Sequence, residues 1–148
     1  MNNSTKLLTD GAVFFRDELY WEAADCFKRI IDSGENESIL DDAYLNLAIC
    51  YMKLNLFHEA AEFFLPVYRK EVGDGVFQND SNNYGETSAR AALGLVRISL
   101  ALDDIKQAQM LIDELETTQA GFIKDEVRTS YFEVAKSELE YFSRSLAS

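Results

Sequence analysis

Large and small apolar residues recur along the first half of the chain with a fixed offset of 37 residues. The first set runs in the order large, small, aromatic, aromatic, alanine and phenylalanine: Leu7, Gly11, Phe14, Tyr20, Ala23 and Phe27. The same order returns 37 positions later as Tyr44, Ala48, Tyr51, Phe57, Ala60 and Phe64. Six matches in one register are rare by chance, so we interpret the two sets as copies of one structural unit.

A third and weaker copy follows at a further offset of 48 residues. Its corresponding positions are Ala92, Val96, Ser99, Ile105, Ala108 and Ile112. The clearest matches are Ala108, which corresponds to Ala60, and Leu95, which corresponds to Leu47. The additional 11 residues fall in the segment 71–83, which is rich in Gly, Asn and Asp. These residue types are typical of loops, so we expect a loop between the second and third copies.

Within each copy the apolar residues follow a helical period on either side of a short polar turn, which predicts a pair of helices. A single Pro and 7 Gly leave these segments largely free of backbone breakers. The expected helices cover about 4–17 and 20–32, 39–54 and 57–70, and 86–102 and 105–116. An apolar stripe over about 122–146 predicts a last helix that caps the third copy.

Local signals place the ends of several of these helices. Ser4 is the expected N-cap of the first helix, and Gly34 follows the end of the second. Ser38, with an acidic residue three positions later, resembles a capping box at the start of the third. Pro66 lies inside the fourth segment, where it predicts a kink or a break near Leu65.

The copies resemble the tetratricopeptide repeat (TPR), a helix–turn–helix unit of about 34 residues. The second copy carries the closest match: Tyr44-Leu-Asn-Leu47-Ala48-Ile-Cys-Tyr51, followed by Phe57, Ala60 and Phe64. The first copy has Asp10 where the family prefers Leu, and the third is degenerate in its first helix. None of the three has Pro after its second helix, as the family signature does.

The resemblance implies an all-α solenoid of antiparallel helix pairs with about seven helices. We expect residues 1–148 to form a single TPR-like domain. Its parts would be repeats at about 4–37, 38–70 and 86–116, a loop at 71–85 and a capping helix at about 122–146.

Stacks of this family expose a concave face made mainly by the first helix of each pair, and the resemblance implies that a partner binds there. In this chain the face would consist of Leu8, Ala12, Phe15, Arg16, Leu45, Asn46, Ile49, Met52, Lys53, Arg90, Leu93, Arg97 and Leu100. Its floor is apolar and its edges are basic, which suits a peptide or protein partner with acidic groups.

Two other interpretations of this face remain open. Arg16 and Lys53 lie in the last turns of their helices, where a cation also stabilises the helix dipole. The apolar residues could instead be covered by the last helix or by a second copy of the chain in a homodimer. Val76, Phe77 and Tyr84 could also fold over the groove, although loops more often pack their own side chains.

Some TPR proteins hold chaperone C-termini through a clamp of Lys, Asn and Arg residues. This chain has Asn46 and Arg90 at two of the five clamp positions. The other three hold Leu8, Ala12 and Gly94, none of which can bind a carboxylate through its side chain. The incomplete set argues against a partner of that class.

The charge and cysteine content narrow the function further. A formal net charge of −12 repels phosphate, which argues against nucleic acid and against an acidic membrane surface as partners. No apolar run approaches the roughly 18 residues of a membrane span, and the first residues lead into no secretion core. Cys26 and Cys50 lie among apolar neighbours, as reduced thiols of a cytoplasmic protein would.

The sequence lacks the motifs of common catalytic and metal sites. His58 is the one histidine, and Glu62 stands where a zinc-protease motif starting at His58 needs its second histidine. The chain contains neither a phosphate-binding glycine loop nor a nucleophile motif. We therefore expect a binding protein without metal or cofactor rather than an enzyme.

Three functions fit these observations. The first is a protein-binding adaptor that uses the concave face. The alternatives are a TPR-type chaperone for a secreted client and a structural module that acts by homo-oligomerisation.

Overall fold

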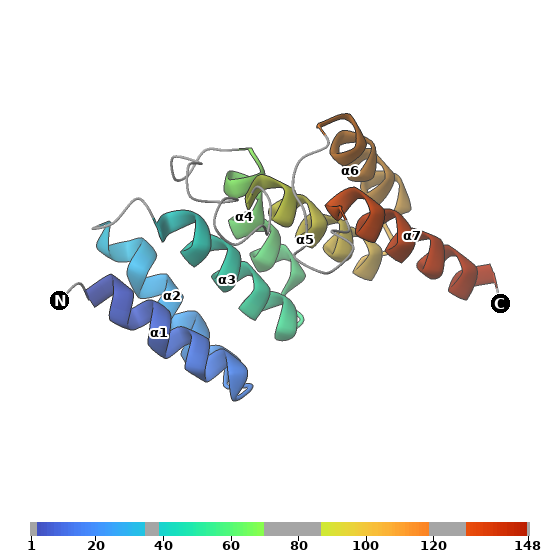
Figure 1. Ribbon diagram of the computed structural model, residues 1–148. Coiled ribbons are helices and arrows are strands. Elements are labelled where there is room, and N and C mark those ends of the chain that lie inside the picture. Colours follow the sequence, from blue (N-terminus) through green and yellow to red (C-terminus); the bar gives the residue numbers. More distant parts are fainter. Residues whose placement is uncertain (1–2, 35–38, 70–86, 119–129, 148) are drawn as a thin grey trace. The chain divides into compact units, whose positions relative to one another are not determined.

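The structure is a computed structural model that describes residues 3–34, 39–69, 87–118 and 130–147 (Figure 1). These residues form seven helices: α1 (Asn3–Arg16), α2 (Tyr20–Ser33), α3 (Leu40–Lys53), α4 (Phe57–Tyr68), α5 (Thr87–Ala101), α6 (Ile105–Thr118) and α7 (Tyr131–Ala147). The chain divides into two compact units, residues 1–75 with α1–α4 and residues 76–148 with α5–α7.

The all-α class expected from the sequence is confirmed. The first six helices begin and end within two residues of the expected bounds. The seventh begins at Tyr131, and the expected start at 122 lies outside the described residues, as does the loop at 71–85 with Val76, Phe77 and Tyr84.

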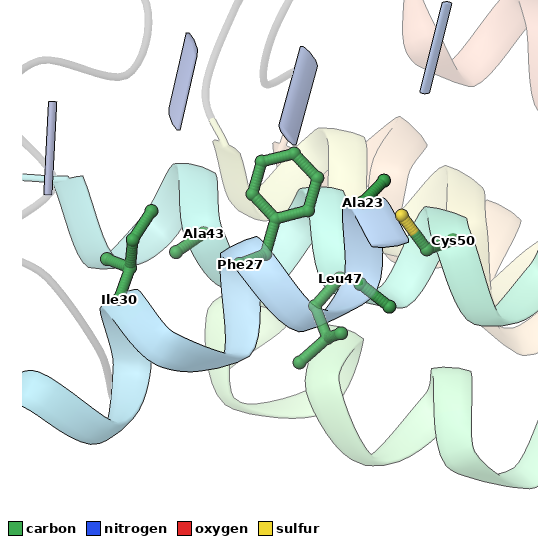
Figure 2. Packing of buried hydrophobic residues seen from close by; sticks show 7 residues of the cluster. Ala23, Phe27, Ile30, Ala43, Leu47 and Cys50 are labelled. Carbon is green, nitrogen blue, oxygen red and sulfur yellow. The ribbon is translucent and has the colours of Figure 1, made fainter. Parts of the chain in front are cut away.

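In the first unit each helix packs against the next, α1 on α2, α2 on α3 and α3 on α4 (Figure 1). The core between α2 and α3 is built from small and large apolar side chains (Figure 2). Its buried members are Ala23, Ala24, Phe27, Ile30, Ala43, Leu47 and Cys50. The alanines bring the helix backbones close together, and the larger side chains fill the space beside them.

The contact between α1 and α2 depends on the glycine at position 11. A Cβ atom added to Gly11 would lie 2.7 Å from two carbons of the Phe27 ring. That ring is itself buried, with 2% of its surface exposed, so it has little room to move. Gly11, the small residue of the first copy of the sequence repeat, is therefore required by a ring on the partner helix.

The three turns that join the paired helices have the same backbone geometry. Glu18, Asn55 and Asp103 each have a positive φ, of 63°, 61° and 61°. The next amide in each turn donates to a carbonyl five residues earlier: Leu19 to Phe14 at 2.8 Å, Leu56 to Tyr51 at 2.8 Å and Asp104 to Ser99 at 2.7 Å. The three positive-φ residues are separated by 37 and 48 residues, which are the offsets found between the apolar side chains of the three copies. The turns of the backbone therefore repeat with the same offsets as the side chains.

In the second unit α5 packs on α6, and α7 packs on both (Figure 1). The residues buried on α6 are Ala108, Leu111, Ile112 and Leu115, and those on α7 are Tyr131, Ala135 and Leu139. The spacing of four between the buried residues of α7 is the helical stripe expected from the sequence.

The expected helix ends were correct in part. Gly34 follows α2 in the left-handed conformation at φ 63°, as predicted. Ser4 lies inside α1 and is buried, whereas an N-cap would precede the helix. Residue 39 is the N-cap of α3 and makes no side-chain cap bond, and Ser38 lies outside the described residues.

Of the kink or break expected near Leu65, the break does not occur, because α4 continues through Pro66 to Tyr68. Pro66 lies two residues from the end of the helix, so its missing N–H removes a hydrogen bond only from the final turn. Phe64 and Val67, on either side of it, are buried, and their packing favours the helical conformation.

We expect Gly11→Ala to destabilise the first unit by about 1 kcal/mol. Alanine gains roughly 1 kcal/mol of helix propensity, but overpacking against a buried ring costs about 1–3 kcal/mol. Urea unfolding measures the difference, and the loss should shrink in a Phe27→Leu background. A stabilised Gly11→Ala protein would show that the ring does not limit this contact.

Glycine substitution should distinguish two of the turn residues. Glu18→Gly should stabilise the first unit by about 0.5–1 kcal/mol, because a side chain larger than Asn is strained at positive φ. Asn55→Gly should change the stability little, since Asn tolerates this conformation. Urea midpoints of the two variants provide the comparison, and a loss of stability in Glu18→Gly would contradict the turn geometry.

Candidate functional site

The first unit places most of its predicted face residues in equivalent positions on α1 and α3. Leu8, Ala12, Phe15 and Arg16 of α1 correspond, at the offset of 37, to Leu45, Ile49, Met52 and Lys53 of α3. Leu8, Phe15, Asn46, Ile49 and Met52 are half-buried, and Ala12, Arg16 and Lys53 are exposed. Both helices pack on α2. We call Leu8, Ala12, Phe15, Asn46, Ile49 and Met52 the α1/α3 face.

Contacts with α2 and with the core of the first unit hold the Phe15 side chain in place. Its ring meets Tyr20 of α2 edge to face, with the ring centres 5.2 Å apart. Leu8 and Phe15 also pack against the core cluster. These contacts fix the two side chains while part of each remains accessible, so the face has a defined shape before any partner arrives.

Three predicted face residues are buried and offer little surface to a partner. Leu45 is 1% exposed, Leu93 is 4% exposed and Leu100 is 8% exposed. Leu45 is followed by the half-buried Asn46, so a shift of one residue on a helix separates the two environments. The sequence repeat predicts which side of a helix a residue lies on, but it does not predict how deeply the side chain is buried.

The cations predicted at the edge of the binding face differ in how accessible they are to a partner. Lys53 is exposed at the end of α3. The guanidinium of Arg16 lies 3.5 Å from the carboxylate of Asp17, with both side chains well exposed. Both cations occupy the last turns of their helices, so stabilisation of the helix dipole explains part of their placement. Arg90 is half-buried on α5.

Arg97 on α5, which the sequence places as a cation at the groove edge, forms a bidentate ion pair with Glu138 on α7. Its Nε lies 2.9 Å from Oε1, and its Nη2 lies 2.9 Å from Oε2. Charge-assisted pairs of this geometry are among the stronger ones. The last helix therefore neutralises a charge that the sequence had assigned to a partner.

A pocket lies beside this ion pair. It has a volume of about 360 Å³ and is lined by Arg97, Leu100, Ser137, Glu138, Tyr141 and Phe142. The Tyr141 side chain remains 70% exposed. Sequence reasoning assigned Leu100 to the face but missed the aromatic residues of α7, because nothing in the repeat relates α7 to α5.

Both cysteine thiols of the chain are buried in the fold. Burial raises the pKa of Cys50 to about 12 and also raises the pKa of Cys26. Both thiols are free and stay protonated near neutral pH, where a thiol is a poor nucleophile. Among the described residues, no group of three or more His, Cys, Asp or Glu side chains could hold a metal ion. Nor is any described helix long and apolar enough to cross a membrane.

Comparison with known proteins identifies the fold. No protein-family model matches the sequence, and no curated protein matches it. Among solved structures, the chain is similar to the first TPR of Spaghetti (RPAP3) bound to the HSP90 peptide SRMEEVD. The two share 21% sequence identity and a TM-score of 0.65, over 99% of this chain and 94% of that one. The chain is therefore a TPR-like helical repeat protein in its fold.

A double-mutant cycle on Arg97 and Glu138, each changed to Ala, should give a coupling energy of about 0.5–1 kcal/mol at low salt. The coupling should fall in high salt, because the pair is partly exposed. The Arg16–Asp17 pair is the control, and its longer and more exposed contact should give a coupling near zero. Equal coupling in the two pairs would remove the special role assigned to the α5–α7 contact.

Proposed function

We propose that the chain is a protein-interaction module that binds a peptide or an extended segment of a partner protein on the α1/α3 face. The observation that carries the proposal is the repetition of accessible apolar side chains at matched positions of two helix pairs. A repeated apolar surface at a constant offset suits a partner that runs across both helices.

The packing of the fold does not account for all of these side chains. Gly11 and Ala48 are the small residues of the repeat, and they serve the contacts between helices. Ile49 and Met52 lie on the same helix as Ala48 but remain half-buried. Apolar surface left accessible gains roughly 25 cal/mol per Å² when a partner covers it. Met52 is flexible and can adapt to side chains of different shapes.

Charge favours a partner whose apolar anchor is flanked by carboxylates. Lys53 is exposed at the end of α3, next to Met52. The rest of the chain is strongly acidic, so an acidic segment would be repelled elsewhere and directed toward this cation. The similar solved structure, the first TPR of Spaghetti (RPAP3), is bound to a peptide with acidic residues, SRMEEVD. This similarity supports a peptide as the kind of partner.

The peptide we propose differs from that one in how it is held. Leu8 and Ala12 stand at two positions where a carboxylate clamp needs polar side chains. An apolar anchor is therefore the main contact, and the charge at Lys53 adds orientation rather than most of the affinity.

The role we propose is that of a cytoplasmic adaptor without catalytic activity. The two buried free thiols, Cys26 and Cys50, fit a reducing compartment. We further propose that residues 1–148 act as one repeat domain with α7 as its terminal cap, since α7 packs on both helices of the third pair.

The direct test compares Met52→Glu with Met110→Glu in binding to a labelled peptide that has a Leu-Phe anchor flanked by Glu. Met110 is 55% exposed on α6 and lies outside the face, so it is a matched control. We expect Met52→Glu to weaken binding more than tenfold, because it puts a charge against the anchor. Met110→Glu should change the affinity less than twofold. Fluorescence anisotropy measures binding, and circular dichroism confirms that both variants are folded.

Two outcomes of this experiment would contradict the proposal. One is equal loss of binding in the two variants. The other is found by competition for the labelled Glu-flanked peptide: the same anchor flanked by Lys displaces it as well as an unlabelled copy of the Glu-flanked peptide does.

A further inference from the structure

The single tryptophan of the chain lies at a position where the fold requires no apolar side chain. At the offsets of 37 and 48, Trp21 corresponds to His58 and Lys106, which are both exposed. Trp21 is also exposed, at 61%, although it lies two residues before the fully buried Ala23. The repeat therefore predicts a polar residue here, and packing does not explain the tryptophan.

A second apolar residue lies in the turn that joins α1 to α2. Leu19, immediately before α2, is exposed at 46%, whereas its counterparts are the half-buried Leu56 and the exposed Asp104. We call Leu19 and Trp21 the hairpin tip. It shares no residue with the α1/α3 face.

Carboxylates dominate the surroundings of Trp21. Asp17, Glu18, Glu22 and Asp25 are all exposed within four residues of it in sequence. The two nearby arginines are already engaged, Arg16 by Asp17 at 3.5 Å and Arg29 by Asp25 at 2.9 Å. Glu18 and Glu22 therefore leave the surface around the hairpin tip negative.

We propose that the hairpin tip is a docking surface for a basic segment of a partner protein, in which Lys or Arg residues flank an apolar side chain. Tryptophan is the side chain that best combines apolar contact area with attraction for a cation over its ring. Glu18 and Glu22 supply the charge that attracts the basic groups. A second copy of the chain is a poorer occupant, because two molecules with a net charge of −12 repel each other.

Because the chain has one tryptophan, its fluorescence reports directly on the proposed surface. The probe is a synthetic amphipathic peptide of Leu and Lys, and its Leu–Glu counterpart is the control. The Leu–Lys peptide should shift the emission to shorter wavelength and saturate, and the Leu–Glu peptide should have no effect. Glu18→Gln with Glu22→Gln should weaken binding of the Leu–Lys peptide about tenfold at low salt.

Trp21→His introduces the residue of the second copy at this position and should leave the fold unchanged. Binding of labelled Leu–Lys peptide, followed by anisotropy, should then be lost. Binding of the Glu-flanked peptide to the α1/α3 face should be unaffected, which separates this inference from the proposed function. The inference is overturned if Leu–Lys and Leu–Glu peptides act alike, if Trp21→His binds Leu–Lys peptide normally, or if sedimentation shows a wild-type dimer that Trp21→His dissociates.

Discussion

The closeness of the paired helices is the constraint on which the hairpins depend. At position 11 a hydrogen is the largest substituent that fits against the ring of Phe27. The second copy repeats the arrangement of small residue and ring in sequence as Ala48 and Phe64. Once the helices are held at this distance, the connecting turn has to be tight, and a residue at positive φ meets that need in all three turns. The small side chains, the short distance between paired helices and the positive-φ turns thus recur at the same positions of each copy.

This coupling explains how much of the fold the sequence could predict. The repeat located six helices closely, because its small and aromatic residues are the packing contacts themselves. It could not predict the pairing of Arg97 with Glu138, which are 41 residues apart and belong to elements that no offset relates. It assigned Leu45 to the accessible face, although one helical position decides between burial and exposure. The break predicted at Pro66 ignored the packing of Phe64 and Val67 around it.

The same register separates structural residues from candidates for function. Positions that keep their character in all copies, such as Ala23, Ala60 and Ala108, are buried and serve packing. Residues that remain apolar without being fully buried, such as Ile49 and Met52, make up the proposed binding face. Trp21 departs from its counterparts altogether. The two proposed surfaces differ in charge, with Lys53 beside one and carboxylates around the other, so they would select partners of opposite charge.

The shared backbone register is the central claim, and NMR scalar couplings across hydrogen bonds test it most directly. Couplings should be present from the amides of Leu19, Leu56 and Asp104 to the carbonyls of Phe14, Tyr51 and Ser99, at distances of 2.7–2.8 Å. The φ-dependent couplings of Glu18, Asn55 and Asp103 should report positive φ at all three residues. Loss of the coupling pattern in any one turn, or a negative φ there, would show that the three helix pairs do not share one geometry.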